Sequence, residues 1–150
     1  MSPTPEPEPR PAPQPATGPS TAADAVPVLT RAVDVDAVAG EREEFWSQEV
    51  LFEANGSLFK AAKGVGSTRW HVHDDQDEVF LVTSGRLVVQ LRDGDVVVGP
   101  GEVFCVPLGV EHCPRADAET RFLIVGTSVT STAAGGKPDW SGDGGVPPAG

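Results

Sequence analysis

The sequence of 150 residues contains no tyrosine, only two cysteines and three histidines, and 11 Lys and Arg against 22 Asp and Glu. Cys105 and Cys113 do not form a spaced array, so we expect packing roles for both rather than disulfides or a cysteine-rich zinc site. The net charge of −11 and the absence of a Lys/Arg cluster exclude the basic surface that nucleic-acid binding needs. We therefore expect no nucleic-acid partner.

Long apolar runs are also missing from the sequence. No stretch is long enough to cross a bilayer, and the N-terminus lacks the basic and then apolar run of a signal peptide. The sequence therefore predicts a cytoplasmic protein that makes no membrane contact.

Proline is unevenly distributed along the chain, because eight of the 15 prolines fall within the first 20 residues. Alternating prolines exclude helix and cannot supply the donors of a sheet ladder. The composition predicts a disordered Pro-rich arm over residues 1–27 and a disordered Gly/Pro-rich tail over residues 131–150. The remaining residues, 28–130, suffice for one compact core but not for two.

The central region consists of short apolar and β-branched runs separated by turn residues such as Asn55-Gly56. Only residues 34–45 offer a short helix, with Asp34 or Asp36 as its cap. The predicted strands cover residues 47–52, 57–61, 68–73, 78–82, 86–91, 95–98, 103–106 and 121–125. So many short strands predict an all-β protein, either an antiparallel sandwich or a barrel.

Strand periodicity also predicts which apolar side chains fill this barrel. Phe80 and Val82 share a face with Glu78, so they should point inward, and Leu87, Val89 and Leu91 should join them from the next strand. Three aromatic residues are expected on the flank or in a dimer contact, namely Trp46, Phe52 and Phe59.

All three histidines lie in two short segments that could converge on one metal ion. His71 and His73 are two apart and would project to one face of a strand, and residues 74–77 would connect this strand to Glu78 as in a hairpin. His112 follows a turn at residues 107–109. Imidazole is a good ligand for Zn, Cu, Fe and Ni, and a carboxylate extends the choice towards Mn. The alternative is that the histidines are structural and are satisfied by hydrogen bonds.

These two segments resemble the signature motifs of the cupin superfamily. In the first motif, four residues separate His73 of the His-x-His pair from Glu78, and six separate Glu78 from a glycine. In the second motif, a glycine is followed after five residues by Pro-x-Gly and then, after two more, by His112. The glycines and proline that complete the match are Gly85, Gly101, Pro107 and Gly109.

The match departs from the family pattern at its two ends, where no metal ligand is expected. The opening glycine is out of register by one, since Gly64 and Gly66 flank the expected position. Ala116 replaces the asparagine that commonly closes the second motif. The resemblance covers roughly residues 45–128. The paired motifs, which span residues 64–116, are together a specific signal for this superfamily.

The resemblance implies a small single-domain cupin with a double-stranded β-helix (jelly-roll) barrel. Its metal ligands would be His71, His73, Glu78 and His112, and its cofactor one divalent transition metal among Fe, Mn, Zn, Ni and Cu. Small cupins commonly form homodimers, here through residues 49–60. They are also likened to mannose-6-phosphate isomerases, but this chain lacks most of that enzyme's length and has few basic residues to hold a phosphate.

Two classes of function remain open under this resemblance. One is a metal-dependent enzyme acting on a small organic molecule, of the dioxygenase, isomerase, epimerase or decarboxylase type. The absence of tyrosine excludes the Cys-Tyr crosslink of some thiol dioxygenases in the superfamily. The other is a non-catalytic module that binds a ligand or partner, which the lack of a further histidine or tyrosine as general base supports.

Arg69 is a candidate substrate-binding residue. It lies two residues before His71, so strand alternation places it on the ligand face, where a guanidinium would suit bidentate binding of a carboxylate or phosphate. In the alternative interpretation, a bulge turns Arg69 outward to pair with Asp74 or Asp75. The sequence leaves both interpretations open.

Overall fold

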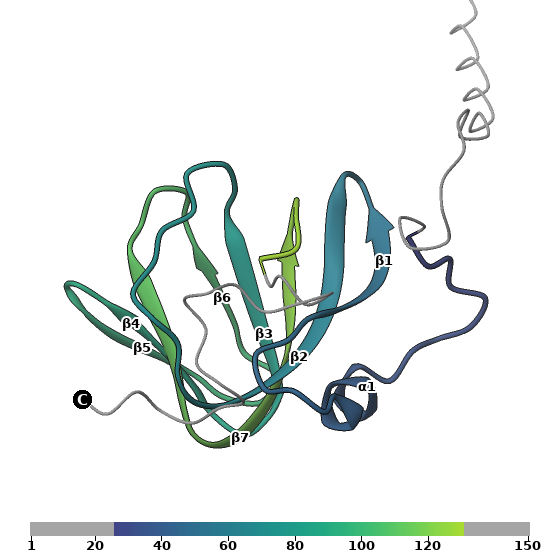
Figure 1. The fold of residues 1–150 in the computed structure, drawn as a ribbon, viewed down its shortest axis with the longest axis horizontal. Helices are drawn as coiled ribbons and strands as arrows, with labels where there is room; N and C mark the ends of the chain where they lie inside the picture. The colour runs from purple at the N-terminus through teal and green to yellow at the C-terminus, as the bar shows by residue number, and fades with distance from the viewer. Residues whose placement is uncertain (1–25, 131–150) are drawn as a thin grey trace, which may run out of the picture.

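In the computed structural model, residues 26–130 are described, and they form one helix followed by seven strands (Figure 1). The elements are α1 (Val35–Glu41), β1 (Glu49–Ala54), β2 (Ser57–Ser67), β3 (Glu78–Ser84), β4 (Leu87–Leu91), β5 (Gly94–Val98), β6 (Val103–Val106) and β7 (His112–Gly126). The predicted tail over residues 131–150, and all but the last two residues of the predicted arm over 1–27, lie outside the described range.

All strand pairs are antiparallel, and β7 is the strand on which the sheet is built. Its C-terminal half lies between β2 and β3, and its N-terminal half pairs with β4, which in turn pairs with β5. The path β1-β2-β7-β3-β6 together with the β4-β5 arm curls into the barrel seen in Figure 1. The predicted all-β jelly-roll barrel is therefore confirmed.

Most of the predicted strands are present, but the last one was predicted too short. β7 starts at His112 rather than at residue 121, and it spans 15 residues. Its first half contains Pro114 and several charged residues, which carry no strand signal of their own. Hydrogen bonds to β4 and β2 hold this half in the sheet, so tertiary pairing overrides local propensity.

The predicted strand over residues 68–73 is wrong. The described chain has only an isolated bridge here, between His71 and His112, and β3 pairs with β6 and β7 rather than with this segment. The chain leaves the sheet after Ser67, where Thr68 is buried and its backbone N and Oγ1 both donate to the Pro114 carbonyl, at 3.0 and 3.2 Å. These contacts replace a regular ladder.

The barrel interior holds the predicted apolar residues. Phe80, Val82, Leu87 and Val89 are all buried in one cluster, and Leu91 packs against it. Trp46 belongs to the same cluster, so its predicted place on the flank is wrong.

Trp46 enters the core because Gly64 leaves room for its ring. A Cβ on Gly64 would lie 2.6 Å from Cη2 of Trp46, and the indole Nε1 donates to the Val65 carbonyl at 3.0 Å. The buried indole therefore has both the space and the hydrogen-bond partner that it needs.

Helix α1 covers the outer face of the sheet. It is shorter than the predicted residues 34–45, and the Asp34 side chain caps it by accepting from the Ala37 backbone N at 3.1 Å. A second cluster centred on Ala39, Leu51 and Ala61 lies beneath it. No helix within residues 26–130 is long and apolar enough to cross a membrane.

The aromatic and cysteine predictions outside the main core have mixed outcomes. Phe52 and Phe59 lie on the flank as predicted, with stacked rings whose centroids are 4.5 Å apart. Cys113 is buried, but Cys105 is exposed, so the predicted packing role of Cys105 is wrong.

Asp36 on α1 ties the helix to the barrel. Its Oδ1 accepts from the hydroxyls of Thr83 and Ser84, both at 2.7 Å, and its Oδ2 accepts from Arg121 Nη1 at 3.0 Å. The Ser84 and Thr83 hydrogen bonds, with a further contribution from Arg121, hold the pKa of this carboxyl below its usual value of 3.8.

We expect Asp36→Asn to lower the free energy of unfolding by about 1 kcal/mol at neutral pH, a value reduced for the partial exposure of the pair. Because the folded-state pKa is depressed, the stabilisation is present above pH 3.8 and is lost as the pH falls through the folded-state pKa. Urea unfolding at several pH values measures this difference. Asp93→Asn, in an exposed turn, is the control. A wild-type advantage that stays constant down to the lowest pH would contradict this account.

Candidate metal centre

The four predicted ligands are brought together at the starts of two strands and in the segment between β2 and β3. Glu78 is the first residue of β3 and His112 the first of β7. His71 and His112 exchange two backbone hydrogen bonds of 3.0 and 2.9 Å, and the Gly109 backbone N donates to the His73 carbonyl at 2.8 Å. Backbone hydrogen bonds therefore join the turn before His112 to both histidines of the His-x-His segment.

The side chains converge as closely as their backbones. Each of the four offers one ligand atom, and these atoms lie within 4.8 Å of one another. Glu78 Oε2 is 2.9 Å from His112 Nε2 and 3.2 Å from His73 Nε2. The His71 ring centroid is 4.2 Å from that of His112 and 5.0 Å from that of His73. This group could hold a single metal ion.

Backbone carbonyls fix the orientation of two imidazoles. His71 Nδ1 lies 2.7 Å from the Arg69 carbonyl, and His112 Nδ1 lies 2.9 Å from the Val110 carbonyl. Because a carbonyl oxygen can only accept, each Nδ1 carries the proton and donates, which leaves Nε2 for the centre of the group. This orientation of Nε2 is what a metal-binding histidine requires, so the residues present fit a metal.

The electrostatics favour the metal-binding protonation state at Glu78 and His71 but not at His73. Burial raises the pKa of Glu78, but the hydrogen bonds from His112 and His73 outweigh it and hold this pKa well below its usual value. Burial lowers the pKa of His71 to about 4, although the hydrogen bond to the Arg69 carbonyl opposes this. The hydrogen bond to Glu78 raises the pKa of His73. At neutral pH, Glu78 is thus an anion and His71 a neutral ligand.

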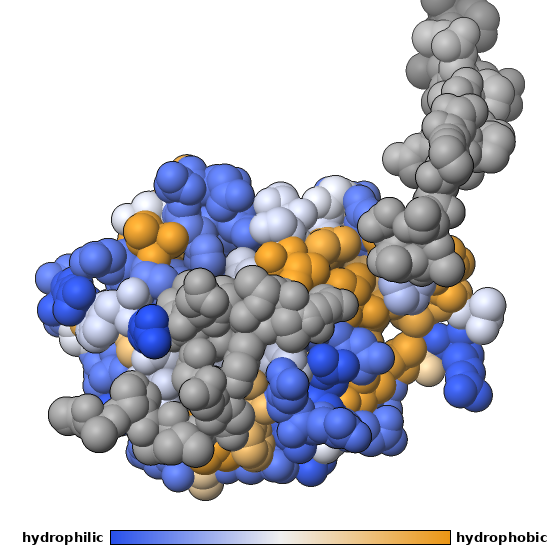
Figure 2. Space-filling view, viewed as in Figure 1, coloured by the Kyte–Doolittle hydropathy of each residue, from blue (hydrophilic) through white to orange (hydrophobic). Residues whose placement is uncertain are grey.

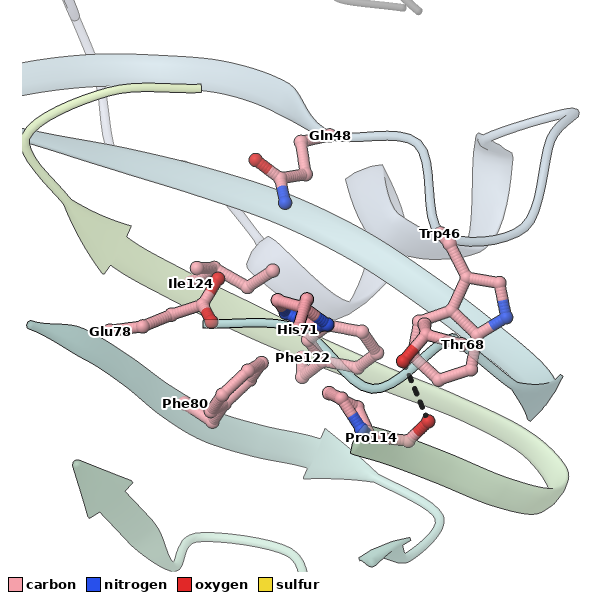
Figure 3. A pocket seen from close by; sticks show the side chains of 9 residues that line it. All are labelled: Trp46, Gln48, Thr68, His71, Glu78, Phe80, Pro114, Phe122 and Ile124. Carbon is pink, nitrogen blue, oxygen red and sulfur yellow. Dashed lines mark hydrogen bonds between the residues drawn. The ribbon is translucent and has the colours of Figure 1, made fainter. Parts of the chain in front are cut away.

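A pocket of about 290 Å³, its open mouth included, lies beside this group (Figure 3). Its wall includes two of the four residues, His71 and Glu78, so a molecule in the pocket would contact the group directly. The other lining residues are mostly apolar, and they are Trp46, Gln48, Thr68, Phe80, Pro114, Phe122 and Ile124.

Arg69 contributes to this site through its backbone. Its side chain is exposed and is not part of the pocket wall, whereas its carbonyl orients His71. Within residues 26–130, its guanidinium forms no ion pair with Asp74 or Asp75.

Sequence reasoning missed three polar residues near the group, namely Gln48, Lys60 and Thr130. The Thr130 hydroxyl donates to Glu78 Oε1 at 3.3 Å, and Gln48 Nε2 donates to Thr130 Oγ1 at 2.6 Å. Lys60 is fully buried, and its charge acts on Glu78 and His73. The alternation of β2 could have placed Lys60 inside, but a lysine in a strand normally indicates the solvent face.

Comparison with known proteins agrees with this geometry. Residues 57–126 match the cupin domain family. The chain is 30% identical over 98 residues to the uncharacterized protein YdbB of Bacillus subtilis (strain 168), an alignment that covers 65% of this chain and 87% of YdbB.

Solved structures show the same relationship. A cupin-2 domain protein from Shewanella frigidimarina is 35% identical, with a TM-score of 0.59 over 62% of this chain and 91% of that one. Protein NMB1881 from Neisseria meningitidis is 25% identical, with a TM-score of 0.58 over 65% of this chain and all of that one. The chain belongs to the cupin family and contains a small cupin-2 domain.

We expect Glu78→Gln to weaken the binding of a divalent transition metal by about 100-fold or more, because it removes the charged ligand. Metal titration by calorimetry and elemental analysis of the purified protein measure this loss. Glu111→Gln, next to His112 but half-exposed and paired with Arg92, is the matched control and should bind metal as the wild type does. Equal metal content in the two variants would show that Glu78 is not a ligand.

Proposed function

We propose that this cupin holds one divalent transition metal through His71, His73, Glu78 and His112 and acts as a metal-dependent enzyme on a small organic molecule. The observation that supports this most directly is that two of the four proposed ligands, His71 and Glu78, also line the pocket. A metal bound there would supply Lewis-acid or redox chemistry next to the pocket. The pocket itself is small and largely apolar.

The lining of the pocket favours one type of reaction. Within residues 26–130, the only ionisable side chains of its wall are His71 and Glu78, and both belong to the proposed ligand set. Lys60 lies outside this wall, and its Nζ donates to the Ser128 carbonyl. An isomerase or epimerase needs a separate side chain to take up and return a proton. We therefore favour dioxygenase chemistry, in which the protein mainly holds the substrate and excludes water.

The residues around the site have defined roles in this proposal. The carbonyls of Arg69 and Val110 hold the rings of His71 and His112. The Thr130 hydroxyl binds one carboxylate oxygen of Glu78 and leaves the other to face the histidines. The aromatic rings of the pocket wall exclude water from the bound substrate.

A non-catalytic binding module is the second candidate function. The same lack of an acid or base outside the ligand set supports it, because a module needs no proton transfer. A module would bind a small molecule in the pocket and release it unchanged.

Metal analysis followed by oxygen-uptake assays distinguishes the two functions. We expect protein reconstituted with Fe(II) to consume oxygen with at least one member of a panel of small carboxylic acids. Glu78→Gln, treated identically, should not. Bound iron with no oxygen uptake across the panel would contradict the dioxygenase proposal. A ligand recovered unchanged would then favour the module.

We further propose that the chain works in the cytoplasm as a homodimer paired through its β1–β2 hairpin. β1 lies at an edge of the sheet path, where backbone groups remain available for a second copy. Apolar residues gather over this hairpin on the face shown in Figure 2. Sedimentation equilibrium should then give twice the chain mass of 15.6 kDa at micromolar concentrations. A single species at the chain mass would contradict the dimer.

A further inference from the structure

Lys60 carries a positive charge into the interior of the barrel. It lies on β2 two residues before Ala62, which belongs to the main core, and its side chain is 0% exposed. Its register partner on β7 is Ile124, and cross-strand partners share one face of a sheet. Ile124 lines the pocket, so Lys60 lies next to a pocket residue on the barrel-facing side of β2, although Lys60 itself is not part of the pocket wall.

The ammonium of Lys60 has little to compensate its burial. Its one hydrogen bond within residues 26–130 is from Nζ to the Ser128 carbonyl, at 2.6 Å, and no carboxylate lies within ion-pair distance of it. Burial lowers the pKa of Lys60 to about 8, while the charge of Glu78 raises it, so the group is mostly protonated at neutral pH. An ammonium buried with no carboxylate within ion-pair distance is costly, and among the described residues only the longer-range charge of Glu78 offsets this cost.

The net charge of the metal-loaded site also favours an anionic ligand. A divalent ion brings two positive charges, Glu78 contributes one negative charge and Lys60 one positive charge, while neutral imidazoles add none. The interior would therefore carry a net positive charge of about two. A low-dielectric interior with this excess favours an anion strongly. A neutral ligand would leave this excess positive charge uncompensated.

The partner of Lys60 in the structure belongs to a segment at the end of the described chain. Residues 127–130 are held by the buried side chains of Gln48, Lys60, Gln76 and Glu78. The Gln76 side chain accepts from the Thr127 backbone N at 2.7 Å and donates to Ser128 Oγ at 2.6 Å, and Gln48 binds Thr130. This segment follows the last strand and, within residues 26–130, forms no ladder hydrogen bonds of its own.

We propose that the pocket takes a small organic anion, and that a carboxylate of this ligand binds Lys60 Nζ in place of the Ser128 carbonyl. The inference rests on the proposed function and assigns the substrate class of the same site. It gives Lys60 the anchoring role that the sequence suggested for Arg69. The segment of residues 127–130 is the part of the protein that moves aside when the ligand binds.

The test measures ligand binding on the full-length, metal-loaded protein by calorimetry. Malonate and succinate are the probes, and their neutral diamides, malonamide and succinamide, are the matched uncharged ligands. Lys60→Gln removes the charge but keeps a donor for the Ser128 carbonyl. Lys63→Gln is the matched control, because Lys63 lies on the opposite face of the same strand and pairs with Glu119. Arg69→Ala tests the other candidate cation.

We expect the wild type to bind at least one dicarboxylate more tightly than its diamide. Lys60→Gln should weaken that binding by about thirtyfold or more, the usual effect of removing one partner of a buried charge pair. Lys63→Gln and Arg69→Ala should bind within about twofold of the wild type, a change too small to indicate a lost charge contact. If Lys60→Gln does not fold, Lys60→Met replaces it, because its apolar chain of similar length fills the same space.

Three results would overturn the inference. They are wild-type affinity in the Lys60 variant, equal binding of diamide and dicarboxylate, and binding of neither dicarboxylate by the wild type. Metal content measured before and after each titration separates this failure from that of the proposed function. Protein that holds no metal contradicts the proposed function, whereas metal-loaded protein that ignores the charge of the probe contradicts only the role of Lys60.

Discussion

The structure depends on the burial of one carboxylate. Glu78 is 3% exposed at the start of β3, and an isolated ionised carboxylate in such a place would cost several kcal/mol. Two imidazoles, the Thr130 hydroxyl and the charge of Lys60 compensate it. These groups come from β2, β7, the segment between β2 and β3, and the end of the described chain. One buried charge therefore fixes the mutual positions of elements far apart in the sequence.

The long strand β7 makes this arrangement possible. It begins with a proposed ligand, His112, continues between β2 and β3, and ends at the segment that binds Lys60 and Glu78. Close packing at Gly64 and Gly126 supports it. Trp46 occupies the space over the first glycine, and the Gln76 side chain that holds residues 127–130 contacts the second. The metal centre and the hydrophobic core thus share one framework.

Local sequence patterns predicted an antiparallel sandwich or barrel, because period-two alternation and turn residues are local signals. The jelly-roll barrel and the set of four converging residues were predicted from the resemblance to the cupin motifs. The pattern failed where distant contacts decide the structure. Residues 68–73 alternate like a strand, yet buried hydrogen bonds from Thr68 to Pro114 draw the chain out of the sheet. The first half of β7 has no strand pattern, yet its neighbours pair with it.

Distant contacts also explain why local sequence did not predict the positions of the Arg69 and Lys60 side chains. Arg69 was placed on the ligand face by the alternation of a strand that does not exist, and its side chain is exposed. Lys60 does follow the alternation of its strand, but a buried lysine contradicts the usual preference of this residue for the surface. Its burial depends on Ser128 and Glu78, which no local window contains.

The central claim is that four side chains share one ion, and X-ray absorption spectroscopy of the metal-loaded protein tests it most directly. The account predicts a first shell with three imidazole nitrogens and one carboxylate oxygen, and with one imidazole fewer in His112→Gln. A shell with fewer than three imidazoles in the wild type, or one unchanged in the variant, would contradict it.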